Sequence, residues 1–281
     1  MVKITMKITL AKSAGFCFGV KRALDIAQNA LKKNHQVCML GDIVHNEDVV
    51  KTINQLGIKK IKQLRKAKDR TLLIRAHGAS SKTFKKAISL GYKIIDATCP
   101  MVKEIHKIAK EAEQNGYSII IIGDNKHDEV KGIMGQLKNK SLVIQSIDDI
   151  PISKIKKAAI VVQSTQNFEK TLFLIKFLKK NIKQVKIFNT ICQPTRIKQK
   201  EIKVLPLKND VMIIIGSKTS ANTHRLFEIS KSLNKKSYWI NSLSDIKRTW
   251  FKNIQTVGIT AGASTPDKTT KEIIEYLSKI K

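Results

Sequence analysis

The chain has 281 residues, of which 42% are hydrophobic and 5% aromatic, which is enough to bury a core in one to three compact units. Its longest apolar runs fall far short of the roughly 20 residues that a membrane span needs. Lys3, Lys7 and Lys12 interrupt any apolar signal sequence near the N-terminus. We therefore expect a cytoplasmic protein that does not cross a membrane.

The formal net charge of +31 is of the kind found in proteins that bind nucleic acids. Lysine nevertheless far outnumbers arginine, the residue suited to bidentate phosphate and base contacts, and the lysines are spread over the whole chain. We interpret them as solvated residues on helix faces and expect no nucleic-acid partner. An RNA-binding protein with salt-dependent affinity is the alternative that the charge leaves open.

Short apolar runs alternate along the chain with segments whose apolar residues recur at a spacing near 3.6. The predicted strands are Lys3–Leu10, Val37–Leu40, Thr71–Ile74, Lys93–Ile95, Ser118–Ile122, Leu142–Ile144, Ala159–Val162, Val185–Phe188, Val211–Ile215, Ser237–Ile240 and Thr256–Thr260. The clearest predicted helices are Val20–Leu31, Val102–Ala112 and Thr171–Leu178. This alternation predicts an α/β fold with mostly parallel sheets flanked by helices.

A weak internal repeat surrounds three of the four cysteines. The segments ITLAKSAGFCFGVKRA, YKIIDATCPMVKEI and VKIFNTICQPTRIK each run from a strand through a short polar turn to a cysteine and a helix start. The repeat predicts three similar lobes, at 14–97 with Cys17, at 98–190 with Cys99, and at 191–281 plus 1–13 with Cys192. The remaining cysteine, Cys38, lies inside a predicted strand and is interpreted as a small core residue.

Polar and ionisable residues follow nearly every predicted strand. They are Cys17, His45, His77, Cys99, His127, Glu129, Ser164, Thr165, Cys192, Ser220, Asn222 and Ser264. In open parallel sheets, functional groups gather beyond the carboxyl ends of the strands. We therefore expect the functional residues of the protein to come from these loops.

Three cysteines at helix starts suit a metal centre, because a helix N-terminus favours the thiolate over the thiol. Three isolated cysteines, without any CxxC pair, would leave one iron of a cubane cluster without a protein thiolate. Spacing alone leaves a zinc site, as in a zinc-dependent phosphohydrolase, and plain structural cysteines open as alternatives. The histidines, Ser220, Asn222 and Ser264 suit a cage for phosphate, and Glu129 is a candidate proton donor.

Seven motifs resemble, in their order, the signatures of the 4-hydroxy-3-methylbut-2-enyl diphosphate reductases of the non-mevalonate isoprenoid pathway. They are AGFCFGVKRA at 14–23, VHN at 44–46, RAHG at 75–78, DATCP at 96–100, HDEVKGIMGQ at 127–136, GSK at 216–218 and TAGASTPD at 260–267. The resemblance implies an oxidoreductase that converts its allylic diphosphate substrate into isopentenyl and dimethylallyl diphosphate. It also implies three lobes in pseudo-threefold arrangement around one central 4Fe–4S cluster.

The resemblance further assigns roles to residues. It implies that Cys17, Cys99 and Cys192 hold the cluster, with the substrate hydroxyl bound at the open iron, and that Glu129, Thr165 and His127 are catalytic. The substrate-binding residues that it implies are His45, His77, His127, Ser164, Thr165, Ser220, Ala221, Asn222 and Ser264. A ferredoxin or flavodoxin would donate the electrons, and we expect a monomer.

The sequence departs from the family pattern in four places. Ser164 stands where a second threonine is usual, and Ser13 stands in place of a common proline. Ala221 replaces a usual serine, so one hydroxyl donor is lost and only the backbone N–H is left there. Pro194 and the pair Ile197–Lys198 replace the usual A-T-x-x-R-Q surroundings of the third cysteine. None of these changes removes a group that the chemistry needs.

Overall fold

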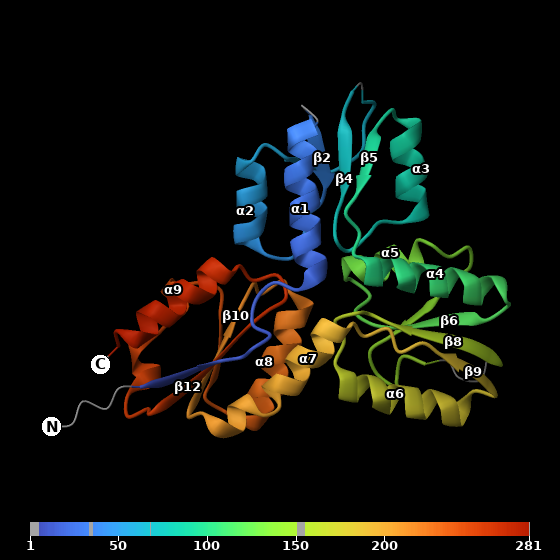
Figure 1. Cartoon of the computed structure of the whole chain (residues 1–281). Helices are drawn as coiled ribbons and strands as arrows, with labels where there is room; N and C mark the ends of the chain where they lie inside the picture. The colour runs from blue at the N-terminus through green and yellow to red at the C-terminus, as the bar shows by residue number, and fades with distance from the viewer. Residues whose placement is uncertain (1–5, 34–35, 68, 151–154, 281) are drawn as a thin grey trace. The chain divides into compact units, whose positions relative to one another are not determined.

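The computed structural model describes residues 6–33, 36–67, 69–150 and 155–280, and these form three four-stranded sheets flanked by helices (Figure 1). All strand pairs in the three sheets are parallel. The predicted α/β class with three similar parallel sheets is therefore confirmed. Among the described residues, no helix combines the length and the apolar character that crossing a membrane would require.

The elements follow one another in strand–helix alternation, as the sequence predicted. The strands are β1 (Lys7–Leu10), β2 (Val37–Leu40), β3 (Lys59–Ile61), β4 (Thr71–Ile74), β5 (Lys93–Asp96), β6 (Ser118–Ile122), β7 (Leu142–Ile144), β8 (Lys157–Val162), β9 (Gln184–Ile187), β10 (Val211–Ile215), β11 (Ser237–Ile240) and β12 (Thr256–Ala261). The helices are α1 (Phe18–Lys33), α2 (Glu47–Gln55), α3 (Ser81–Ser89), α4 (Pro100–Gln114), α5 (Asp128–Met134), α6 (Phe168–Asn181), α7 (Gln193–Ile202), α8 (Ala221–Leu233) and α9 (Asp267–Ser278). Short 3₁₀ turns lie at Leu205–Lys208, Leu243–Asp245 and Arg248–Phe251.

The chain divides into two compact units. Unit 1 comprises Met1–Phe18, His45–Val49 and Gln193–Lys281 and contains the sheet β1-β12-β10-β11. Unit 2 comprises Gly19–Val44 and Val50–Cys192 and contains the sheets β3-β2-β4-β5 and β7-β6-β8-β9. Each sheet takes its strands from one of the predicted lobe ranges, and the lobe boundaries themselves stay a prediction.

In unit 1 the sheet is covered on both faces. The strand β10 reads VMIII and is buried throughout, the continuous apolar run that is typical of a covered parallel strand. Because successive side chains of a strand point to opposite faces, Val211 packs in a cluster with Ile273 of α9. Ile214 packs on the other face with Ile202 of α7 and Leu226 of α8.

In unit 2 the same layering recurs in both sheets. Ile121 of β6 packs with Ile105 of α4, whereas Ile122 packs with Leu174 of α6 on the opposite face. Figure 1 shows α4 and α6 on opposite sides of the sheet β7-β6-β8-β9, and it shows α3 across the sheet of β2, β4 and β5 from α1 and α2. Each sheet is therefore the middle layer of an α/β/α sandwich.

The three sheets also share one strand order. In unit 2, β5 and β9 are edge strands, each preceded along the chain by the three other strands of its sheet. In unit 1, β1 takes the same edge position beside β12, although it comes first in the sequence. Each of these edge strands leads to one of the repeated cysteines, so the internal repeat that was predicted from Cys17, Cys99 and Cys192 is present in the topology.

Candidate functional site

The three cysteines that were predicted as ligands occupy the same place in their sheets, between an edge strand and the following helix. Cys17 directly precedes α1, Cys99 is the N-cap residue of α4, and Cys192 directly precedes α7. The backbone N–H of each donates to a carbonyl in the loop after the neighbouring strand, namely that of Ala263 at 3.0 Å, Ala76 at 2.9 Å and Ser164 at 3.1 Å. The same tether thus fixes every one of these cysteines at a helix start, where an anionic sulfur is favoured.

The four cysteines differ in their accessibility. All four are thiols, and Cys17, Cys99 and Cys192 are partly exposed, whereas Cys38 is buried in β2 at 6% exposure. Burial raises the pKa of the Cys38 thiol and outweighs the opposing effect of Arg70. Cys38 therefore behaves as the core residue that the sequence predicted, packed with Leu72 and Ile74 of β4.

Histidines and hydroxyl residues also stand at equivalent points of the repeat. Gly41, Gly123 and Gly216 follow β2, β6 and β10, and the fourth residue after each glycine is His45, His127 and Ser220 respectively. The residue directly after each tethering carbonyl is His77, Thr165 and Ser264. Six of the predicted site residues therefore form two sets of three, one at the end of the first strand and one at the end of the third strand of each repeat.

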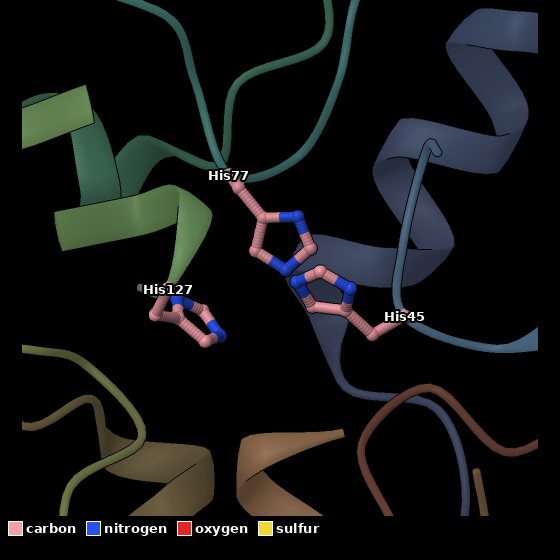
Figure 2. Close-up of side chains that lie close together, drawn as sticks. All are labelled: His45, His77 and His127. Carbon is pink, nitrogen blue, oxygen red and sulfur yellow. The ribbon is translucent and has the colours of Figure 1, made fainter. Parts of the chain in front are cut away.

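In unit 2, His127 and His77 are neighbours. Their rings meet edge to face, with centroids 5.5 Å apart and an interplanar angle of 85° (Figure 2). His127 is the N-cap residue of α5, and its Nδ1 atom accepts a hydrogen bond of 3.2 Å from the Glu129 N–H. Because Nδ1 is an acceptor, the neutral ring carries its proton on Nε2, which can donate to an anionic ligand.

Glu129 is a buried carboxyl group that the fold joins to Ser164. Its side chain is 2% exposed, and its two oxygens accept from the Ser164 N–H at 2.6 Å and the Ser164 hydroxyl at 2.7 Å. Burial raises the pKa of Glu129, and the two hydrogen bonds from Ser164 oppose this shift. A carboxyl group with a raised pKa can hold a proton at a pH where an ordinary carboxyl has lost it.

Thr165 is held by a residue that sequence reasoning missed. Gln163 is 1% exposed, and its Nε2 atom donates to the Thr165 hydroxyl oxygen at 3.0 Å while its Oε1 atom accepts from the Asp124 N–H at 2.8 Å. Since the Thr165 oxygen accepts here, its O–H remains able to donate elsewhere. A glutamine directly after the buried strand β8, in the motif VVQST, was the available sequence signal.

In unit 1, the residues at the start of α8 leave polar groups available to a ligand. The Ser220 hydroxyl caps the helix by accepting from the Thr223 N–H at 3.3 Å. Ala221 is the first helical residue, a position whose N–H has no partner within the helix. Asn222 is 4% exposed, and neither polar atom of its amide has a hydrogen-bond partner within the described ranges. An unsatisfied buried amide costs about 1–3 kcal/mol, so Asn222 points to a polar ligand.

His45 and Ser264 also belong to unit 1. The Ser264 hydroxyl donates to the backbone carbonyl of His45 at 3.0 Å, and Ser264 is 6% exposed. Asn46 caps the following helix, because its Oδ1 atom accepts from the Val49 N–H at 3.1 Å. These bonds fix the backbone that carries the imidazole of His45, which is drawn with the other two histidines in Figure 2.

The fold and these residues define an α/β protein whose repeated strand ends carry thiols, imidazoles and a buried carboxyl group. Residues 8–278 match the model of the LytB protein family, and the chain belongs to that family. A relative from Geobacter metallireducens, a 4-hydroxy-3-methylbut-2-enyl diphosphate reductase, is 38% identical over 276 residues, which cover 98% of this chain and 98% of the relative. The resemblance that the seven motifs indicated is therefore confirmed.

Two solved structures are similar along nearly the whole chain. One is an (E)-4-hydroxy-3-methyl-but-2-enyl diphosphate reductase, the terminal enzyme of the non-mevalonate pathway, with 38% identity and a TM-score of 0.72, covering 98% of this chain and 100% of its own. The other is the E-1-hydroxy-2-methyl-but-2-enyl-4-diphosphate reductase of Plasmodium falciparum, with 27% identity and a TM-score of 0.92, covering 98% of this chain and 89% of its own.

Proposed function

We propose that the protein is an iron–sulfur reductase that removes the hydroxyl group of 4-hydroxy-3-methylbut-2-enyl diphosphate. Two electrons and two protons enter, the allylic C–O bond breaks, a C–H bond forms, and water leaves together with isopentenyl or dimethylallyl diphosphate. The repeated tether that places a cysteine at the start of α1, α4 and α7 is the structural observation that carries this proposal. The membership in the LytB protein family supports it.

Cys17, Cys99 and Cys192 would hold one 4Fe–4S cluster. The fit of these residues to such a group rests on their partial exposure, their identical tethers and their helix-start positions, which favour thiolates. When bound, the cluster would relay the two electrons one at a time from the external donor and would offer, as a Lewis acid, an iron without a cysteine ligand. Cys38 takes no part, because it is buried in β2.

The repeated strand ends would bind the diphosphate. The proposed donors are His45, His77, His127, Ser220, the backbone N–H of Ala221, Asn222 and Ser264. The Nε2–H tautomer of His127 suits an anionic oxygen acceptor, and so does the amide of Asn222, which has no partner in the part of the chain that the structure describes. Ser264 would turn its hydroxyl from the His45 carbonyl to the ligand, since a hydroxyl has only one proton to donate.

Glu129 would supply the protons. Burial raises the pKa of Glu129, and a carboxyl group that holds its proton more firmly in this way can deliver it to the departing oxygen. Ser164 holds both oxygens of Glu129, and Thr165, supported by Gln163, would orient the substrate hydroxyl or a water. Fixing donor and acceptor in this way lowers the entropic part of the barrier.

The electrons would come from a ferredoxin or a flavodoxin. Both are small acidic carriers, and the net charge of +31 gives this protein the opposite sign. We further propose that the protein is a cytoplasmic monomer, which a separate electron carrier can reach. No resident nucleic-acid partner is part of the proposal.

Replacing Asn222 by leucine should stabilise the protein and weaken substrate binding. Leucine removes a buried amide that has no partner among the described residues, so the free energy of unfolding should rise by about 1–3 kcal/mol. Loss of a hydrogen bond to a charged oxygen should weaken diphosphate binding about 10- to 100-fold. Thermal unfolding without substrate and calorimetric titration with the substrate measure the two effects. Asn234→Leu is the control, because Asn234 Nδ2 donates to the Asn209 carbonyl at 2.8 Å and its loss should destabilise without weakening binding.

The proposed function is tested on protein purified without oxygen. We expect iron and acid-labile sulfide in equal amounts, near four of each per chain in a 4Fe–4S protein, and conversion of 4-hydroxy-3-methylbut-2-enyl diphosphate to the two isomeric products by a chemical reductant. A protein that holds zinc in place of iron and sulfide, or that carries the cluster and leaves this substrate unchanged, would refute the proposal.

A further inference from the structure

The largest fully buried side chain in the described part of the molecule is that of a charged residue, Lys198. It lies on α7, six residues after Cys192, and is 2% exposed. Burial lowers the pKa of Lys198 to about 8, against the opposing effects of Cys17, Glu201 and Asp267, so the ammonium still carries its charge at neutral pH. Removing a charge from water costs several kcal/mol unless other groups compensate, and the surroundings of Lys198 show which groups do so.

The ammonium of Lys198 is held by three backbone carbonyls of unit 1. Its Nζ atom donates to the carbonyls of Ser13, of Gly15 at 3.0 Å and of Ala261 at 3.1 Å. An ammonium group has three N–H donors, so all of them are used. Ser13 and Gly15 belong to the loop that runs from β1 to Cys17, whereas Ala261 ends β12. Lys198 therefore ties the helix that follows Cys192 to the loop that carries Cys17.

The rest of this loop is arranged around the same ammonium. Gly15 has a φ of +90°, and a Cβ atom at its position would lie 2.6 Å from Oδ1 of Asp267, so the backbone must pass close to that carboxylate. The Glu201 carboxylate accepts from the Ser13 N–H at 3.0 Å and also from the Ser13 hydroxyl. Glu201 on α7, Asp267 on α9 and Cys17 at the end of the loop all raise the pKa of Lys198 by charge interaction and so favour its buried positive charge.

A second cysteine loop shows a comparable contact. In unit 2, the guanidinium of Arg22 on α1 donates to the carbonyl of Thr98 at 3.2 Å, and Thr98 directly precedes Cys99. Arg22 lies on the helix after Cys17, as Lys198 lies on the helix after Cys192. In both cases a cation from the helix after one cysteine holds the backbone just before another, which argues for a role in presenting the cysteines.

We propose that Lys198 is a positioning residue of the cysteine site. It holds the Cys17 loop by the carbonyls of Ser13 and Gly15, binds the carbonyl of Ala261 at the end of β12, and places one positive charge near Cys17. The inference rests on the proposed function, because the proposed cluster supplies the anionic sulfurs with which the Lys198 ammonium would interact. A cation beside the cluster favours its reduced form, so its loss should lower the reduction potential. Loss of the three carbonyl contacts should loosen Cys17 and let the cluster escape sooner.

Three replacements separate these two effects. Lys198→Met keeps the length of the side chain and removes both charge and donors, Lys198→Gln removes the charge and keeps an amide donor, and Lys198→Arg keeps both. Lys231→Met is the matched control, since Lys231 also donates to a backbone carbonyl, that of Lys235, but lies at the far end of α8 in the same unit. The protein is used at full length, with the cluster reconstituted without oxygen.

The first measurement is loss of iron to a chelator. We expect Lys198→Met to lose iron about 10- to 100-fold faster, the range typical of residues that support a metal ligand, and Lys198→Arg and Lys231→Met to behave as the parent. The second is the reduction potential, which should fall in both Lys198→Met and Lys198→Gln. The third needs no cluster. Alkylation of the metal-free thiols, followed by mass spectrometry, should show faster modification of Cys17, relative to Cys99, in Lys198→Met than in Lys198→Gln, because both variants lack the charge and only the glutamine keeps a donor to the loop.

The outcomes decide the inference independently of the proposed function. If the parent protein binds no iron and sulfide, the proposed function fails. Selective alkylation of Cys17 in Lys198→Met would then still support the inference that Lys198 holds the Cys17 loop. If the parent binds the cluster and a folded Lys198→Met matches it in iron loss, potential and alkylation, the inference is wrong. Should Lys198→Met not fold, an unchanged potential in Lys198→Gln overturns the charge role. Lys198→Arg keeps the charge and the donors, so its cysteines should react as in the parent. A faster alkylation of all cysteines in this variant would likewise contradict a specific role at Cys17.

Discussion

Each of the three single variants Cys17→Ser, Cys99→Ser and Cys192→Ser should fail to retain the iron–sulfur cluster and should therefore lose all turnover. Each cysteine stands alone at its strand end, so no neighbouring thiol can take over as ligand. The serine variants should fold, because the tethers from residues 17, 99 and 192 use the backbone N–H and not the sulfur. Iron and sulfide analysis and visible absorbance of oxygen-free preparations provide the measurement.

Cys38→Ser is the control for these three variants. Its hydroxyl would be buried in the core of unit 2, which costs about 1–3 kcal/mol, so the protein should become less stable and still retain the full cluster. Equal loss of iron from a folded Cys38→Ser protein would show that the ligands are assigned wrongly. Retention of a full cluster by any one of the other three variants would remove that cysteine from the proposed ligand set.

The strands of the fold could be predicted wherever burial on both faces left a continuous apolar run. The segments VMIII at β10 and VCML at β2 have the predicted bounds, and β8 and β12 are longer than predicted by residues at their ends. The strand β3 was missed because its three residues, KKI, carry two lysines at the exposed edge of a sheet. The first part of the predicted strand Lys3–Leu10 lies outside the described residues.

The residues of the candidate site could be predicted in kind, but their contacts could not. Strand-end positions and motifs pointed to Glu129 and Ser164, yet no local pattern indicates that Ser164 supplies both hydrogen bonds to Glu129 from another strand end. The role of Lys198 was hidden for the same reason, since its partners Ser13 and Ala261 are distant in the sequence. A lysine in a chain with so many lysines also carries little signal of burial.

The equivalence of His127, His45 and Ser220 shows how a repeat can be kept while its chemistry diverges. The residue at this position is a histidine in two repeats and a serine in the third, and the residue two places on is Glu129, Glu47 and Asn222 respectively. Glu47 accepts from the Ser217 hydroxyl at 2.8 Å and is exposed, whereas Glu129 is buried. Burial raises the pKa of Glu129, so the carboxyl group at this position suits proton delivery in that repeat.

Glu129→Gln should leave the cluster and substrate binding intact and lower kcat about 100- to 10,000-fold, the usual contribution of a general acid. Glutamine has the size of glutamate and can still accept the Ser164 N–H, but it has no acidic proton. Because the lost interaction acts in the transition state, KM should change little. Glu113→Gln is the control, since the Glu113 carboxylate also accepts backbone N–H groups, those of Lys138 at 3.0 Å and Asn139 at 2.8 Å, away from the strand ends.

The pH dependence of the unfolding free energy tests the raised pKa of Glu129 independently of turnover. Since burial raises the pKa of Glu129, the folded protein binds more protons than the unfolded chain between the ordinary carboxyl pKa and the raised one. Glu129 therefore stabilises the fold fully below the ordinary value, and this contribution is lost as the pH rises through the raised value. Glu129→Gln should remove that fall, so its unfolding free energy relative to the parent should increase with pH. A constant difference across this window, together with unchanged kcat, would assign the protons to another group.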